Sequence, residues 1–371
     1  MRIQTTTQTE RHRPDHPQGP APKGRGLLHA PGVTAFDTQP HVAPFCAMAR
    51  INPHRPYTPD PAQMALAPAI TGNTINGLAE GQTRRPDMVY WAPDPDAIAH
   101  GKMQRWFYTT RPDDDRFATM AAWRDAIYAS PLPEITGAPT DRTPQAWTKA
   151  LDAFITNGAC DKIGVAAMDQ NWTYQGHSVP QSRVIVLGVQ HAYDAIATAP
   201  DHTAALEVLR QYGRAAKAAK DITAWLRLQG WAAEPVTGPM TGTITLIPPA
   251  LACGFGELGK HGSLITPDFG SSFRLSAVLT DAPFAVTPQQ SHGIDDFCTN
   301  CRICEDACPP EAIAPEKQTV RGVEKWYVDF DKCLPYFNEN QGCAICIAVC
   351  PWSRPGIGLN LAAKLERRAN R

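Results

Sequence analysis

The sequence predicts a mixed α/β (α+β) protein in which a larger domain precedes a small cysteine-rich one. Helix-like and strand-like patterns interleave between residues 147 and 279, as they do in two-layer α/β and α+β domains. Eight of the eleven cysteines follow residue 297, in two closely spaced runs. A chain of 371 residues is long enough for two domains, each with its own core. We expect an extended or disordered segment over 1–45, a larger domain over 46–290 and a cysteine-rich domain over 291–371.

The clearest secondary-structure signals lie in the second half of the larger domain. Apolar residues recur at three- and four-residue steps over 203–228, which predicts a long amphipathic helix that ends at Gly230. The run RVIVLGV at 183–189 is typical of a buried strand. Residues 46–144 contain aromatic clusters but only weak helix and strand signals. Further elements are expected as a helix at 146–157 and as strands at 163–168, 273–279 and 326–330.

The two cysteine runs have the spacing of a pair of iron–sulfur clusters. The first is C-x2-C-x2-C-x3-C-P from Cys298, and the second is C-x9-C-x2-C-x3-C-P from Cys333. In two-cluster ferredoxins the three closely spaced cysteines bind one [4Fe–4S] cluster, and the cysteine before proline ligates the other. Zinc ribbons use paired C-x2-C knuckles, and disulfide frameworks belong to small secreted chains. The predicted ligands are Cys298, Cys301, Cys304 and Cys350 for the first cluster, and Cys333, Cys343, Cys346 and Cys308 for the second.

Charge and hydropathy favour a cytoplasmic protein. The 35 basic residues are balanced by 36 acidic ones, which gives no support for a nucleic-acid or membrane-surface partner. The N-terminal residues contain no apolar core of a signal peptide, and no stretch approaches the ~18 to 20 apolar residues of a membrane span. Cys46, Cys160 and Cys253 lack ligand spacing, and we expect them to be small buried residues.

A glycine-rich tract runs from Ala252 to Thr280, with the sequence ACGFGELGKHGSLITPDFGSSFRLSAVLT. Its glycines allow the backbone to approach a large ligand closely or to turn with positive φ. The spacing Gly254-x-Gly256-x-x-Gly259 matches the dinucleotide-binding expression. No convincing strand–helix unit flanks it, however, so a nicotinamide site is disfavoured.

The run GFGELGKHGSLITPDFG, followed by Arg274 and by the sequence TDAP from Thr280, closely resembles the cobalamin-dependent reductive dehalogenases. The strand RVIVLGV, the helix with Tyr212 and the run LRLQGWAAEPV are similar to that family as well, so that the resemblance covers roughly 147–355. It implies a nitroreductase-like α/β domain that holds base-off cobalamin, followed by a ferredoxin-like domain with two [4Fe–4S] clusters. None of the eleven histidines lies in an Asp-x-His-x-x-Gly frame, which is compatible with a base-off corrinoid.

The resemblance also implies an activity, the reductive removal of halide from an organohalide. Its electrons would come from an external donor, such as a ferredoxin or a flavodoxin with its reductase. Tyr212 is then the proton donor and Arg274 assists it, because a nearby cation makes a phenol proton easier to give. Trp352 is expected to wall the substrate cavity, and Trp106, Tyr108 and Tyr174 are further aromatic candidates. The expected corrinoid contacts are Gly254, Gly256, Glu257, Gly259, Lys260, Ser263, Leu264 and Thr266, with His261 as a further polar neighbour.

Two alternatives stay open. Epoxyqueuosine reductases combine similar modules for tRNA chemistry, but they carry a Val-Asp-x-x-Pro-x-x-Glu-Arg segment. The corresponding TLIPPALACGFGE, from Thr245, lacks its acidic residue and its Glu-Arg pair. An electron-transfer or cobalamin-handling protein would not need Tyr212 and Arg274 together. The sequence leaves open whether the organohalide is aryl or alkyl.

Overall fold

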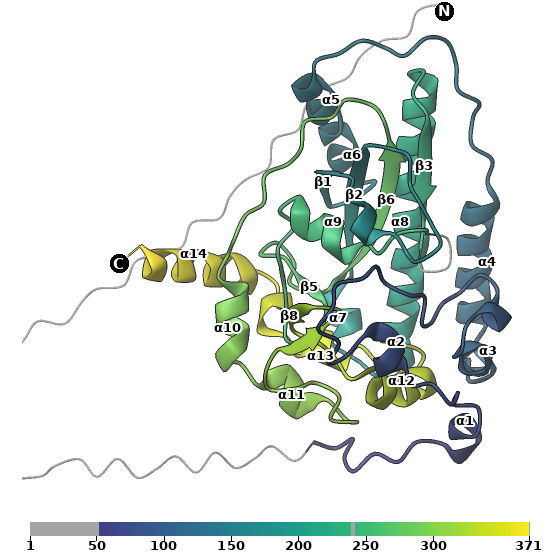
Figure 1. The fold of residues 1–371 in the computed structure, drawn as a ribbon, viewed down its shortest axis with the longest axis vertical. Coiled ribbons are helices and arrows are strands. Elements are labelled where there is room, and N and C mark those ends of the chain that lie inside the picture. Colours follow the sequence, from purple (N-terminus) through teal and green to yellow (C-terminus); the bar gives the residue numbers. More distant parts are fainter. Residues whose placement is uncertain (1–51, 239–241, 371) are drawn as a thin grey trace, which may run out of the picture. The chain divides into compact units, whose positions relative to one another are not determined.

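The computed structural model describes residues 52–238 and 242–370, which lie in one compact unit (Figure 1). The expected segment 1–45 and Cys46 lie outside the described residues. A four-stranded antiparallel sheet of order β1-β2-β6-β3 forms the centre of the larger domain. The mixed α/β (α+β) prediction is confirmed. The strands are β1 (Lys162–Ala167), β2 (Arg183–Gln190), β3 (Ala233–Val236) and β6 (Phe273–Thr280).

Strand β2 is buried on both faces, which explains its unbroken apolar sequence. Successive side chains of a strand point to opposite faces of the sheet. Accordingly, Ile185 and Leu187 pack in one core with helix α8 (His202–Leu228). Val184 and Val186 pack in a second core, against α9 (Ile247–Ala252) and the glycine-rich tract that follows it.

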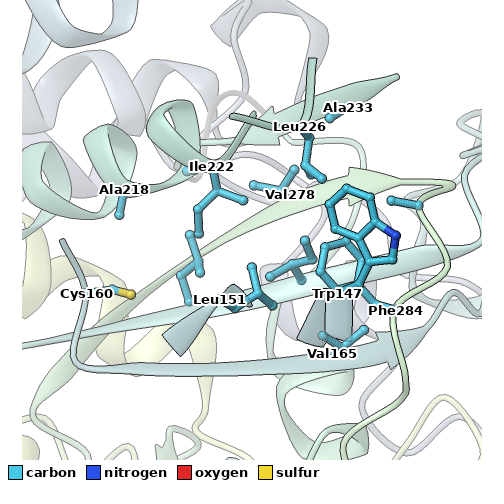
Figure 2. Packing of buried hydrophobic residues seen from close by; sticks show 14 of the residues in the cluster. Trp147, Leu151, Cys160, Val165, Ala218, Ile222, Leu226, Ala233, Val278 and Phe284 are labelled. Carbon is cyan, nitrogen blue, oxygen red and sulfur yellow. The ribbon is translucent and has the colours of Figure 1, made fainter. Parts of the chain in front are cut away.

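Helix α8 forms as predicted and anchors the first core. The Asp201 side chain caps its N-terminus by accepting a hydrogen bond from the Thr203 amide, and Gly230 follows its end with a φ of 81°. Its apolar face presents Ile222 and Leu226, both fully buried, to the sheet and to Trp147 (Figure 2). The predicted helix at 146–157 is two short helices, α5 (Pro144–Ala150) and α6 (Asp152–Thr156).

Two helices that the sequence did not predict, α3 (Gly101–Thr109) and α4 (Asp115–Ala129), precede these elements in the chain. Helix α4 runs alongside α8 (Figure 1). Gly213 of α8 makes this approach possible, because a Cβ there would lie 2.2 Å from the ring of Trp123. Lys220 of α8 donates hydrogen bonds to the carbonyls of Ile127 and Tyr128, each at 2.9 Å, and to that of Ser130. These bonds satisfy carbonyls at the C-terminal end of α4.

The cysteine-rich segment consists of short helices and one hairpin. The strand predicted at 326–330 is wrong: the hairpin of β7 (Gln318–Val320) and β8 (Val323–Lys325) ends before it. Asp329 instead caps helix α12, which contains Cys333, by accepting a hydrogen bond from the Lys332 amide. The remaining elements are α10 (Ile294–Asn300), α11 (Ile303–Ala307), α12 (Phe330–Glu339), α13 (Ile345–Ala348), η3 (Pro351–Ser353) and α14 (Ile357–Ala369).

Short elements connect these parts of the unit. Among the described residues, no helix is long and apolar enough to cross a membrane. The short elements are α1 (Pro61–Met64), α2 (Gly72–Asn76), η1 (Pro95–Ala97), η2 (Gln170–Trp172), α7 (Tyr193–Ile196), β4 (Glu257–Leu258) and β5 (Leu264–Ile265).

Candidate active site and cluster-binding cysteines

The structure gathers the eight cysteines of the two runs into two groups. In the first group, Cys350 joins the three closely spaced cysteines of the first run around one small cavity. Burial, and then the neighbouring thiols of this group, raise the pKa of Cys304 to about 12. Cys308 packs in one cluster with Cys333 and Cys346 of the second run, and after burial and the Cys343 thiol its proximity raises the thiol pKa of Cys333. The fourth cysteine of each run therefore lies with the other run.

Each group is a donor set that a [4Fe–4S] cluster can use. Four thiolates hold such a cluster, and buried thiols lose their protons only when a cation compensates the charge. Burial, followed by other thiols, raises the pKa of Cys346 well above its ordinary value. The residues present therefore fit two clusters. Cys160 and Cys253 are buried, as expected, and lie in the apolar cores on either side of the sheet.

A cavity of about 380 Å³ lies between α8, β6, the α3–α4 region and the end of α12. Tyr212, from α8, and Arg274, from β6, both line it. The Arg274 guanidinium carbon lies 4.6 Å from the centroid of the Tyr212 ring, so the predicted pair forms a cation–π contact. The other lining residues are Trp91, Phe107, Tyr108, Arg111, Phe117, Arg124, Tyr128, Ala205, Val208, Leu209, Phe337, Gln341 and Gly342.

The cysteine-rich segment forms one wall of this cavity. Gln341 donates hydrogen bonds to the Phe107 carbonyl at 3.0 Å and to the Thr110 hydroxyl at 2.7 Å, which fixes the end of α3. Phe337 stacks on Phe107 with a centroid distance of 5.9 Å. Gly342, which also lines the cavity, directly precedes Cys343 of the second cysteine group. The second cysteine group is therefore joined directly, through the Gly342–Cys343 peptide bond, to a residue that lines the cavity.

Three buried polar atoms near the Tyr212–Arg274 pair have no hydrogen-bond partner among the described residues: Arg274 Nε, Gln211 Oε1 and His191 Nε2. Burial, and then the charge of Arg274, hold the pKa of His191 well below its ordinary value. Buried polar groups are normally satisfied, and of these three residues Arg274 lines the cavity, so its unpaired nitrogen indicates that a ligand completes it. A corrinoid, with its amide-bearing periphery, fits such a site.

The predicted corrinoid contacts of the glycine-rich tract have protein partners in the structure. The Glu257 carboxylate accepts hydrogen bonds from the Asp295 amide at 2.9 Å and the Ser291 hydroxyl at 3.0 Å, which ties it to α10. A Cβ at Gly256 would lie 1.8 Å from the Ile265 carbonyl oxygen, so this glycine permits a close approach of two backbone segments. Thr266 is fully buried and bonds to Asp268 at 2.8 Å. Contact between this tract and a corrinoid stays a prediction.

Trp352, Lys260 and His261 lie around the first cysteine group. Trp352 is 1% exposed and packs edge-on against Phe297 at 5.5 Å. It does not lie among the described residues that line the larger cavity. Lys260 is buried, with its ammonium 3.6 Å from Glu305 Oε2.

Several cavity residues were not predicted from the sequence. Of the three softer aromatic candidates, Tyr108 lines the cavity, whereas Trp106 and Tyr174 do not appear in its described lining. Arg111, Arg124 and Tyr128 line it without having been singled out. The only sequence signal for them was the density of aromatic residues before residue 130.

Comparisons with known proteins identify a family model and several relatives. Residues 297–353 match the family model of the 4Fe-4S dicluster domain. A tetrachloroethene reductive dehalogenase of Desulfitobacterium hafniense is 33% identical over 217 residues, which are 55% of this chain and 39% of that protein. An epoxyqueuosine reductase of Cellulophaga algicola is 31% identical over 122 residues, 28% of this chain and 36% of that one.

Solved structures of a catabolic reductive dehalogenase share the fold. One superposes with a TM-score of 0.65 at 21% identity and covers 82% of this chain and 47% of that one. Another, in complex with 3-bromo-4-hydroxybenzoic acid, gives a TM-score of 0.61 at 22% identity, over 81% of this chain and 46% of that one. The chain thus resembles the reductive dehalogenases in sequence and in fold, and spans less than half the length of these relatives.

Proposed function

We propose that this chain is a reductive dehalogenase, which replaces the halogen of an organohalide by hydrogen with the help of two [4Fe–4S] clusters and a corrinoid. The observation that supports it most is the Tyr212–Arg274 pair in a cavity walled by the cysteine-rich segment. The resemblance to reductive dehalogenases over 55% of the chain supports the same activity. When bound, a base-off corrinoid in its Co(I) state would supply the electron pair that cleaves the carbon–halogen bond.

The reaction consumes two electrons and one proton and releases one halide ion. The eight cysteines hold the clusters through which an external ferredoxin or flavodoxin delivers the electrons. Tyr212 donates its hydroxyl proton to the carbon that loses the halogen. Arg274, stacked on the Tyr212 ring, holds this ring in place and stabilises the negative charge that the phenol acquires. The aromatic walls exclude water, so that the proton comes from the positioned hydroxyl.

The cavity favours an aromatic organohalide with an anionic group. Trp91, Phe107 and Phe337 offer ring faces and edges to a flat substrate, and Trp91 and Phe107 meet at right angles with centroids 5.0 Å apart. Arg111 also lines the cavity, and it forms no ion pair with any described residue. A guanidinium without a carboxylate partner suits a substrate carboxylate or phenolate.

Halide release by the reconstituted protein tests the proposal. The chain would be loaded anaerobically with clusters and cobalamin, reduced chemically, and supplied with 3-bromo-4-hydroxybenzoate or with tetrachloroethene. We expect bromide from the aromatic anion at a higher kcat/KM than chloride from the neutral alkene. Arg111→Gln should raise KM for the anion at least several-fold and leave the rate with the neutral alkene unchanged. Fully loaded protein that releases no halide from either compound would refute the activity.

The same assay separates the alternatives. An epoxyqueuosine reductase or an electron carrier would accept electrons without releasing halide. The relative from Cellulophaga algicola matches only 28% of this chain. The near-neutral charge of the whole sequence also gives no support for a tRNA partner.

A further inference from the structure

The cavity of the first cysteine group contains two side-chain nitrogens that lack a partner. His261 and Trp352 both line this cavity, together with Cys298, Cys301, Cys304 and Cys350. The Nε2 atom of His261 and the Nε1 atom of Trp352 are buried and form no hydrogen bond with any residue that the structure describes. Each residue is at most 4% exposed, so water does not readily satisfy these atoms.

Both nitrogens are donors. An indole nitrogen can only donate. The Ser263 amide donates a hydrogen bond to His261 Nδ1 at 3.2 Å, so Nδ1 is the acceptor and a neutral ring carries its hydrogen on Nε2. Two N–H groups thus lack acceptors beside four thiols. The sulfur atoms of an iron–sulfur cluster are acceptors of this kind.

Other groups around the same cysteines add to this positive environment. The backbone amide of Lys260 lowers the thiol pKa of Cys298, which burial otherwise raises. Burial raises the thiol pKa of Cys350, and three hydrogen-bond donors lower it: the amides of Trp352 and Ser353 and the hydroxyl of Ser271. The buried Lys260 ammonium lies 5.2 Å from the Trp326 ring centroid. Its charge lowers the thiol pKa of Cys304, which burial raises, and so favours the thiolate.

We infer that His261 and Trp352 donate N–H···S hydrogen bonds to the first cluster and thereby raise its reduction potential. The inference rests on the proposed cluster ligands, and it assigns the two residues to the cluster and not to the corrinoid or the substrate. Reduction adds negative charge to the cluster, and donors that point at its sulfurs stabilise the reduced form more than the oxidised one. The first cluster then accepts an electron more readily than it would without them.

The test is a redox titration of the intact, cluster-loaded chain followed by electron paramagnetic resonance. Trp352→Phe and His261→Leu each remove one donor. Because these donors stabilise the reduced cluster more than the oxidised one, each loss should lower the equilibrium constant for reduction of the first cluster about tenfold. For a one-electron couple this equals about 59 mV towards more negative potential. The second cluster should keep its potential.

Two further variants serve as controls. His261→Gln retains an amide N–H at the end of the side chain and should restore part of the potential that His261→Leu loses. Trp147→Phe also deletes a buried, unpaired indole N–H, but in the α8 core, where it packs on Phe284. It should leave both potentials unchanged.

Unchanged potentials in His261→Leu and Trp352→Phe with both clusters present would overturn the inference alone. If Trp352→Phe does not assemble its clusters, the comparison of His261→Leu with His261→Gln decides, and equal potentials in that pair would overturn it. A wild-type chain that binds no cluster under the same conditions would overturn the proposed function as well.

Discussion

Tyr212 and Arg274 come from a helix and a strand, and their side chains meet in the cavity. If Tyr212 is the proton donor, Tyr212→Phe removes the proton and preserves the ring that Arg274 contacts. We expect the rate of halide release to fall by about 10² to 10⁴, the usual effect of losing a general acid. Iron and cobalamin contents should stay at the wild-type level, as measured by metal analysis and the visible spectrum.

Tyr193→Phe is the matched control for this variant. Tyr193, in α7, also loses only a hydroxyl, and it is not among the described residues that line the cavity. It should release halide at the wild-type rate. If Tyr212→Phe dehalogenates at a near-normal rate with full cofactor loading, a different group supplies the proton.

At the residue scale, the sequence predicted the Tyr212–Arg274 pair only through the family resemblance, because a tyrosine on the apolar stripe of a helix is more often part of a core. Arg111 and Tyr128 could not be predicted in the same way. Tyr128 faces the cavity because α4 packs on α8, a contact that depends on Gly213 and Lys220 far along the chain, and Arg111 lies in the connection that precedes α4. Lys260, expected at a corrinoid, is buried and also forms an ion pair with Glu305, while its contact with a corrinoid stays a prediction.

At the scale of elements, α8 supports the core on one face and the cavity on another. Leu226→Ala would leave a void in the core beside Trp147, and such truncations cost about 2 to 5 kcal/mol of unfolding free energy. Leu228→Ala, in the same helix but at a side chain that is 56% exposed, should change stability by no more than about 0.5 kcal/mol. Urea denaturation of both variants measures the difference. Equal losses would show that α8 is not held by this apolar face.

Helices and strands were predicted correctly where the apolar pattern extends over many residues. The prediction failed where a helix cap determines the local structure. The 27 residues of α8 and the strand β2 have patterns that only one structure satisfies. The run at 326–330 is rich in aromatic and β-branched residues, as strands are, but only Val328 forms a bridge, and Asp329 then caps α12 by accepting a hydrogen bond from the Lys332 amide. The sequence patterns of α3 and α4 are weak, so these helices were not predicted. Tertiary contacts with Gln341 and with α8 hold them in place.

At the scale of the molecule, the clusters are expected to be part of the fold. The chain should bind about eight iron atoms, four for each cysteine group. Removing them should lower the thermal midpoint, because ligand binding that requires folded cysteines stabilises the folded state. Circular dichroism before chelation, after chelation and after anaerobic reconstitution measures the loss and its recovery. A midpoint that does not respond to iron would contradict the assignment of the eight cysteines.

The cysteine spacing and the α/β pattern occupy separate stretches of the sequence, but the described residues lie in one compact unit, and the domain division at residue 290 stays a prediction. The sequence did not predict where these two stretches contact each other in the fold. Phe337, Gln341 and Gly342 lie between cluster cysteines in sequence, and nothing in their local pattern indicates that they wall a cavity with α3 and α8. Such a wall depends on how two separately patterned segments pack, which no periodicity records.

The exchange of the fourth cysteine between the two groups has a consequence for biosynthesis. Cys350 completes the group that begins at Cys298, so the ribosome must translate the whole cysteine-rich segment before the first donor set exists. The second donor set is complete only at Cys346, so neither run of cysteines alone supplies all the final ligands of a cluster. Cells that make this protein have to keep all eight thiols reduced and available until synthesis has passed residue 350, because only then can both clusters have their final ligands.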